Sequence, residues 1–126
     1  MNYNTAILKK YVANAPLALA VERVVESKLY PLYDLRKPVL DIGCGEGLFA
    51  HIVFKDKIET GIDPDTTELR RANELGAYSE LLECYGNNIT KPDSSFNTII
   101  SNSVLEHIPD IEEVFVEAYR LLKPGG

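Results

Sequence analysis

The feature that most constrains the fold is a glycine-rich turn directly after a short apolar run. Residues 39–42 read Val-Leu-Asp-Ile, and glycines follow at Gly43, Gly45 and Gly47. A short apolar run bounded by glycines is typical of a buried parallel strand. Glycines at that place allow a tight turn and let the backbone approach a ligand closely. The pattern therefore predicts a strand, a ligand-binding turn and a helix, in that order.

The remaining chain alternates between apolar runs and helical spacing. Further strands are predicted over 58–63, 78–85 and 96–101, and helices over 48–54, 64–76 and 110–122. Asp110 and Glu113 have the spacing of a capping box at the start of the last helix. Strands that alternate with helices form βαβ units. We therefore expect an α/β fold, a Rossmann-like parallel sheet with helices on both faces.

Residues 1–37 have a helical pattern that is interrupted at Pro16, with Asn14 as a candidate cap. The apolar residues of the second helix recur at helical spacing, at Leu17, Val21, Val24, Val25 and Leu29. Such a helix is amphipathic and either covers the sheet or forms part of a lid over a site. Glu22 and Arg23, on the same helix, are expected to form a surface ion pair.

An acidic residue ends the second predicted strand. Asp63 lies twenty residues after Gly43, where a carboxylate accepts hydrogen bonds from both ribose hydroxyls of an adenosine cofactor. A dinucleotide fingerprint would place its third glycine at position 48, which is Leu48 here. The negative charge of Asp41 would also be unfavourable near the phosphates of a dinucleotide. It suits a ligand with a positive group, such as an amino group or a sulfonium.

Composition excludes several function classes. The 126 residues fit one domain, and the net charge of −6 without a basic cluster disfavours a nucleic-acid or anionic membrane surface. No run reaches the roughly 18 apolar residues of a membrane span. The first residues lack the pattern of a signal peptide, so we expect a cytoplasmic protein. Two cysteines without a CxxC pattern disfavour a disulfide framework, and we expect no metal site.

Four ordered motifs together resemble a known family, the class I S-adenosylmethionine-dependent methyltransferases, and most closely their small-molecule branch, type 11. The glycine turn matches the family's first motif, and Gly-Ile-Asp-Pro at 61–64 matches its second, acidic motif. Residues 101–110 are similar to the segment after the family's fourth strand. Residues 120–126 are similar to the turn before its fifth strand.

The resemblance also implies an arrangement of the chain. Only four strands would be present, in the order 3-2-1-4, so we expect 38–126 to be the N-terminal part of an incomplete cofactor-binding domain, truncated after the fourth strand. Residues 1–37 would form an N-terminal helical cap. Strand four would be an exposed edge, and because bare edges invite pairing, a homodimer through that edge is expected.

The resemblance assigns roles to individual residues. The methionine portion of S-adenosylmethionine would be held by Asp41, Gly43, Cys44, Gly45 and Gly47. Asp63 would hold the ribose, and Pro64 would pack near the adenine. The adenine edge would meet Asn88 and Ile89, and Ser101 and Asn102 would line the pocket at the end of strand four.

The implied chemistry is methyl transfer to a small-molecule acceptor, with S-adenosylhomocysteine as product. The cofactor carries most of the reactivity, and a general base is needed only if the acceptor must lose a proton. His107 is the candidate catalytic base, with Glu106 beside it; the competing interpretation is a semi-buried histidine that closes the start of a helix. Cys44 lacks a partner base and is not expected to be a nucleophile.

Two other functions remain open from the sequence. One is a non-catalytic cofactor-binding or interaction module. The other is an NAD-dependent dehydrogenase, which Leu48 and the 101–110 segment disfavour.

Overall fold

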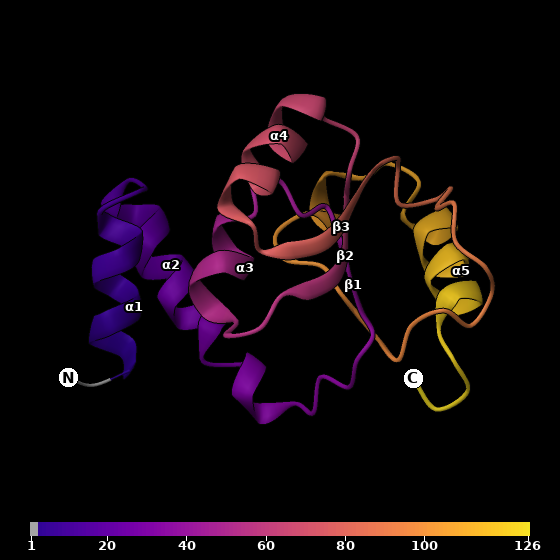
Figure 1. Ribbon diagram of the computed structural model, residues 1–126, viewed down its shortest axis with the longest axis horizontal. Helices are drawn as coiled ribbons and strands as arrows, with labels where there is room; N and C mark the ends of the chain where they lie inside the picture. The colour runs from indigo at the N-terminus through magenta and orange to yellow at the C-terminus, as the bar shows by residue number, and fades with distance from the viewer. Residues whose placement is uncertain (1–2) are drawn as a thin grey trace.

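Four parallel strands form the sheet at the centre of the computed structural model, which describes residues 3–126 (Figure 1). The strands are β1 (Val39–Ile42), β2 (Ile58–Asp63), β3 (Tyr78–Glu83) and β4 (Thr98–Ile100). They are ordered β3-β2-β1-β4, and each neighbouring pair is parallel. The α/β fold, the parallel sheet and the strand order predicted from the sequence are thus confirmed.

The helices follow the predicted alternation with shifted ends. They are α1 (Tyr3–Val12), α2 (Leu17–Ser27), α3 (Leu48–Val53), α4 (Thr66–Leu75) and α5 (Ile111–Leu121), with 3₁₀ turns η1 (Tyr30–Leu32) and η2 (Leu105–His107). The second helix, α2, ends at Ser27, and Pro31 lies inside η1. The third and fourth strands are shorter than predicted: residues 84–85, 97 and 101 lie outside them, and Phe96 makes only an isolated bridge to Leu122.

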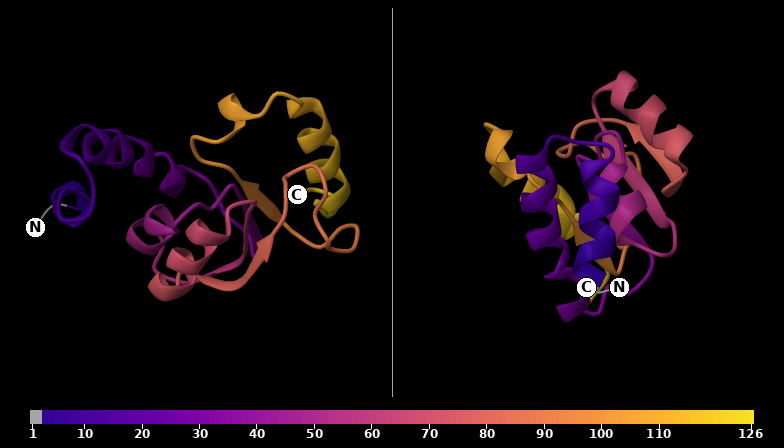
Figure 2. Two further views of the ribbon diagram at one scale, coloured as in Figure 1. Left: turned by 90° about the horizontal axis from the view of Figure 1, so that it is seen from above. Right: turned by 90° about the vertical axis from the view of Figure 1, so that its left-hand side faces the viewer.

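Alternate residues of β1 face opposite layers of the core. Val39 packs in one cluster with Ala50 of α3 and Ala72 of α4. Leu40 packs in another with Val114 and Leu121 of α5. Figure 2 shows α5 on the other side of the sheet from α3 and α4. Because successive strand side chains point to opposite faces, a short all-buried strand such as β1 needs helices on both sides.

The N-terminal helices pack beside α3 and form a third cluster. Ile7 and Tyr11 of α1 meet Ala20 and Val24 of α2 and Ile52 of α3. The predicted apolar stripe of α2 is only partly buried: Val24 is buried, whereas Leu17 is 65% exposed and Val25 is 57% exposed. The α1–α2 hairpin therefore joins the core through a narrow contact.

Two predicted caps are wrong. Asp110 makes no side-chain cap of α5, and the Glu113 carboxylate accepts from Asn87 Nδ2 at 2.7 Å. Asn14 donates back to Lys10 O at 2.7 Å, and α2 begins at Leu17 without a side-chain cap. The well-formed cap is at Asp65, whose carboxylate accepts from the backbone of Thr67 and Glu68 at the start of α4.

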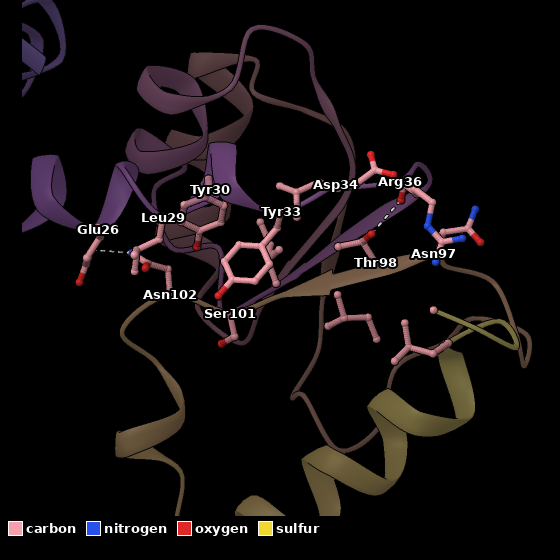
Figure 3. A pocket seen from close by; sticks show the side chains of 15 residues that line it. Glu26, Leu29, Tyr30, Tyr33, Asp34, Arg36, Asn97, Thr98, Ser101 and Asn102 are labelled. Carbon is pink, nitrogen blue, oxygen red and sulfur yellow. Dashed lines mark hydrogen bonds between the residues drawn. The ribbon is translucent and has the colours of Figure 1, made fainter. Parts of the chain in front are cut away.

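A groove of about 560 Å³ runs beside β4, the edge strand of the sheet (Figure 3). Tyr30 and Tyr33 line it on one side, and Thr98, Ser101 and Asn102 line it from β4 and its continuation. Throughout the described part of the chain, each helix falls short of the length and apolarity that a membrane crossing requires.

Candidate functional site

A cavity of about 330 Å³ lies at the carboxyl ends of β1 and β2, where an open α/β sheet places its ligand. The glycine turn, Asp41 and Asp63 line it from the sheet. Asn102 and Ser103 line it from the segment after β4, and α1 and α2 supply further residues. The sheet thus brings together parts of the chain that are far apart in sequence.

The glycine turn adopts a backbone that only glycine takes readily. Gly43, Gly45 and Gly47 have φ values of 75°, 51° and 76°. The N–H groups of Gly43 and Cys44 both donate to Ile62 O at 2.9 Å, so the turn is fastened to β2. A Cβ on Gly43 would lie 2.5 Å from the side chain of Val104, which leaves no room for any other residue.

Asp63 ends β2 and is fastened to the glycine turn. Its Oδ2 accepts from Gly45 N at 3.0 Å, and its Oδ1 accepts from Asp65 N at 2.9 Å. The half-buried carboxylate lines the cavity with lone pairs left for further donors. Such a group suits the two vicinal hydroxyls of a ribose.

Asp41 is a buried carboxylate that lines the cavity. It is 6% exposed, and Oδ2 accepts from the Tyr78 hydroxyl at 2.6 Å. Burial raises the pKa of Asp41 to about 6, and the Tyr78 hydrogen bond opposes that rise while the Asp63 charge adds to it. Burial and the Asp41 charge also raise the pKa of Tyr78, so Tyr78 remains a donor. A cationic group in the cavity would favour the ionised form of Asp41.

The segment after β4 closes another side of the cavity. Ser101 Oγ donates to Ile42 O at 2.9 Å, and Asn102 Nδ2 donates to Glu26 Oε2 at 3.0 Å, as Figure 3 shows for Glu26 and Asn102. Ser103 has a φ of 56°, an uncommon conformation for a residue other than glycine. Asn102 lines both the cavity and the groove beside β4, whereas Ser101 lines the groove.

Five predicted site residues are not among those that line the cavity: Pro64, Asn88, Ile89, Ser101 and His107. Ile89 is buried, and its N–H donates to Glu117 Oε1 at 2.8 Å. The His107 side chain is 78% exposed, with Nε2 3.9 Å from Glu106 Oε1. The roles given to these five residues stay predictions.

Cys44 lines the cavity as a thiol. Burial and the charge of Asp41 raise its pKa, which disfavours the thiolate that a nucleophile needs. Among residues 3–126, no three histidine, cysteine or carboxylate side chains gather as a metal site would require.

From the sequence, no site role was predicted for Tyr11 and Arg23, which line the cavity, or for Tyr78, which donates to Asp41. The predicted Glu22–Arg23 surface pair is wrong, because Arg23 Nη1 bonds Glu26 Oε2 at 2.5 Å and Ser103 Oγ at 2.6 Å. The sequence shows that Tyr78, an aromatic residue with a hydroxyl group, stands at the start of a predicted strand. It does not show that this hydroxyl donates to Asp41, which is 37 residues away. A contact over this sequence distance cannot be predicted from the spacing of neighbouring residues.

A family model, two curated relatives and a solved structure that match this chain are each described as a methyltransferase. A family model described as "Methyltransferase domain" matches residues 40–126. An uncharacterized methyltransferase of Mycobacterium bovis is 33% identical over 91 residues, covering 70% of this chain and 46% of the relative. A sterol 24-C-methyltransferase of Neurospora crassa is 34% identical over 96 residues, covering 70% of this chain and 25% of the relative.

A solved structure shares the fold. It is a Thermotoga maritima protein described as an SAM-dependent methyltransferase and possible histamine N-methyltransferase. It superposes with a TM-score of 0.71 at 25% identity, over 81% of this chain and 47% of that one. This chain thus spans less than half the length of each of these three relatives.

Proposed function

This chain belongs to the methyltransferase domain family, whose cofactor is S-adenosylmethionine, and we propose that it holds this cofactor in the cavity and serves methyl transfer to a small-molecule acceptor. The observation that carries the proposal is the juxtaposition of Asp41, Asp63 and the glycine turn around one cavity. Asp63 would accept from the ribose hydroxyls. Asp41 and the turn would meet the methionine portion, where the cofactor has its positive charges.

The residues present fit this cofactor better than a dinucleotide. Asp41, Glu46, Asp63 and Glu68 all line the cavity, and four carboxylates would repel a pyrophosphate. Leu48 stands at the start of α3 where a dinucleotide turn needs its third glycine. Measured binding of NAD without binding of S-adenosylhomocysteine would favour the dehydrogenase alternative instead.

The contribution of the protein to catalysis would be orientation and exclusion of water. The sulfonium supplies a reactive methyl group when the cofactor is bound. Fixing the reacting groups in line accounts for up to about 7–11 kcal/mol of a barrier. The fastened turn and the Asp63 carboxylate would fix the cofactor without rearrangement, because both are held by backbone hydrogen bonds of 2.9–3.0 Å.

His107 remains the proposed base for an acceptor that must lose a proton. A positioned base contributes about 100- to 10,000-fold. Its exposed ring lies on η2, which follows the segment after β4 that lines the cavity.

A small-molecule acceptor is supported by charge and by the relatives. A net charge of −6 opposes polyanions such as nucleic acid. The names of two relatives point to small acceptors, a sterol in one and possibly histamine in the other. These acceptors differ, so the proposal extends to the class only.

We also propose that residues 1–37 act as a helical cap and 38–126 as the cofactor-binding unit. The cytoplasmic location and the homodimer through β4 stay predictions. A non-catalytic cofactor-binding or interaction module stays the alternative to an enzyme.

Calorimetric titration of S-adenosylhomocysteine into the chain and into Asp63→Ala tests the proposal. We expect saturable binding that weakens by about tenfold or more in Asp63→Ala, since a carboxylate with two ribose contacts is lost. Asp56→Ala is the matched control, because Asp56 is exposed and outside the cavity. Absence of binding by the parent chain would overturn the proposal.

A further inference from the structure

Two hydrogen-bond donors from the N-terminal helices line the same cavity as the glycine turn. They belong to two residues that line the cavity, Tyr11 on α1 and Arg23 on α2. Both lie outside the family match, which begins at residue 40. Their position raises the question of which part of a bound ligand they contact.

The Tyr11 hydroxyl is buried without a partner. Tyr11 is 2% exposed and packs among Ile7, Ala20 and Val24. Among the side chains that the structure describes, in residues 5–126, its oxygen is the one buried polar atom that makes no hydrogen bond. Burial raises the pKa of this phenol, so it keeps its proton and can donate. A buried donor without an acceptor is unfavourable, and an acceptor oxygen on a ligand in the cavity would satisfy it.

Arg23 is held in place by hydrogen bonds that use only some of its N–H groups. Its side chain is 18% exposed, and its recorded hydrogen bonds, to Glu26 and Ser103, all use Nη1. A guanidinium has five N–H donors, so Nε and Nη2 remain for a ligand. Glu26 is itself held by Asn102 and Ser103, which fixes the direction of the guanidinium. The fork geometry matches a carboxylate bound through two oxygens.

The charged side chains that line the cavity complement a zwitterionic ligand. Arg23 is the one cationic side chain among the residues that line it, whereas Asp41, Glu46, Asp63 and Glu68 are acidic. An amino acid offers one carboxylate and one ammonium group. A single positive position among carboxylates complements that pair of charges.

We propose that Arg23 and Tyr11 bind the carboxylate of the cofactor's methionine portion, so that the α1–α2 hairpin recognises the amino-acid end of the ligand. This inference rests on the proposed function. In this arrangement Glu26 is a positioning residue that orients Arg23, and Ser103 shares the guanidinium. The hairpin therefore closes one end of the cofactor site, beyond its packing against α3.

The alternative role of Arg23 is a staple between α2 and the segment after β4. A matched pair of ligands separates the two roles: S-adenosylhomocysteine and its decarboxylated analogue, which keeps the adenosine, the sulfur and the amine. The affinities of both are measured by calorimetry for the parent chain, Arg23→Gln, Tyr11→Phe and Glu22→Gln. Glu22 is the control, since it is exposed on the same helix.

We expect the parent chain to prefer S-adenosylhomocysteine by about tenfold or more, the effect of one charge-assisted hydrogen-bonded pair. Arg23→Gln should abolish that preference and leave the affinity for the decarboxylated analogue within about twofold. Tyr11→Phe should reduce the preference by about threefold to tenfold, as one neutral donor is lost. Glu22→Gln should change neither affinity.

Equal losses for both ligands in Arg23→Gln would assign Arg23 to the staple and overturn the inference. An equal affinity of the parent chain for the two ligands would overturn it too, and this outcome stands even if Arg23→Gln fails to fold. If the parent chain binds neither ligand, the proposed function itself falls. Binding of both without preference leaves the proposed function intact, so the two failures are distinguishable.

Discussion

The hydroxyl of Tyr78, the first residue of β3, donates a 2.6 Å hydrogen bond to Oδ2 of Asp41, the third residue of β1. Both side chains are buried, and β2 separates their strands in the sheet. The bond therefore crosses beneath β2, where Gly61 leaves the space: a Cβ on Gly61 would lie 2.7 Å from the Tyr78 ring. Three strands therefore position the Asp41 carboxylate: β1 carries it, β3 supplies the Tyr78 donor, and β2 leaves the space at Gly61.

Removing the Tyr78 hydroxyl should cost stability when Asp41 is ionised. We expect Tyr78→Phe to lower the free energy of unfolding by about 1–3 kcal/mol at pH 8, because a buried carboxylate loses its donor. Urea denaturation measures the change. Tyr85→Phe is the control, since Tyr85 is 69% exposed. Equal effects of the two substitutions would contradict the importance of the bond.

The raised pKa of Asp41 should make stability fall as the pH rises. The pKa is about 6 in the folded protein and 3.8 for an ordinary aspartate. The folded state thus binds the proton more tightly, and its contribution is complete below about pH 4 and lost through about pH 6. The shift of roughly two units corresponds to about 3 kcal/mol.

Asp41→Asn isolates this contribution. The free energy of unfolding of the parent chain relative to the variant should fall by up to about 3 kcal/mol between pH 4 and pH 7. Glu80 and Glu117 have lowered pKa values and act in the opposite direction, but both proteins retain them, so they cancel in the difference. A difference that is flat or that rises with pH would show that Asp41 titrates normally.

Cofactor affinity should have the opposite pH dependence. If ionised Asp41 meets the positive end of the ligand, protonation of Asp41 weakens binding. We expect the affinity for S-adenosylhomocysteine to drop by about tenfold between pH 7 and pH 5, given a pKa near 6. In Asp41→Asn the profile should be flat over the same range. Calorimetry at several pH values provides the measurement, and an unchanged slope in the variant would rule Asp41 out as its origin.

Alanine at Gly43 should be more disruptive than alanine at Gly76. Both glycines have positive φ, 75° and 68°, so each substitution incurs about 1–2 kcal/mol of backbone strain. Only Gly43→Ala also places a methyl 2.5 Å from Val104, whereas the corresponding space at Gly76 is open. We expect the larger loss of stability at Gly43, with partial rescue by Val104→Ala. Equal losses measured by urea denaturation would show that the close approach is unimportant.

The homodimer prediction concerns the exposed edge of β4. An unpaired edge beside a partly apolar groove favours pairing with a second copy. Light scattering should then show a mass that rises toward twice the monomer with concentration. Tyr33→Asp, in the groove, should weaken association, and Tyr119→Asp, 85% exposed on α5, should not. A constant monomer mass at high concentration would disprove it.

Short-range patterns were sufficient for the elements and for the residues that follow the strands. The apolar run before Gly43 predicted β1, and the position of Asp63 at the end of β2 followed from the βαβ order. The capping box predicted at Asp110 did not form, and its Glu113 carboxylate instead accepts from Asn87 of the β3–β4 loop, a partner that local spacing does not show. The apolar stripe of α2 failed similarly, because spacing shows amphipathicity without showing what covers it.

The sequence by itself determined the parallel α/β fold, the glycine turn and the two acidic residues that flank it, because each depends on neighbours along the chain and on the fixed geometry of βαβ units. Only the tertiary structure decided that Tyr78 reaches Asp41, and that Tyr11 and Arg23 of the N-terminal helices enter the same cavity. These contacts join residues on separate elements. Their occurrence depends on how the helices and strands pack, and packing is set by the whole core rather than by any local pattern.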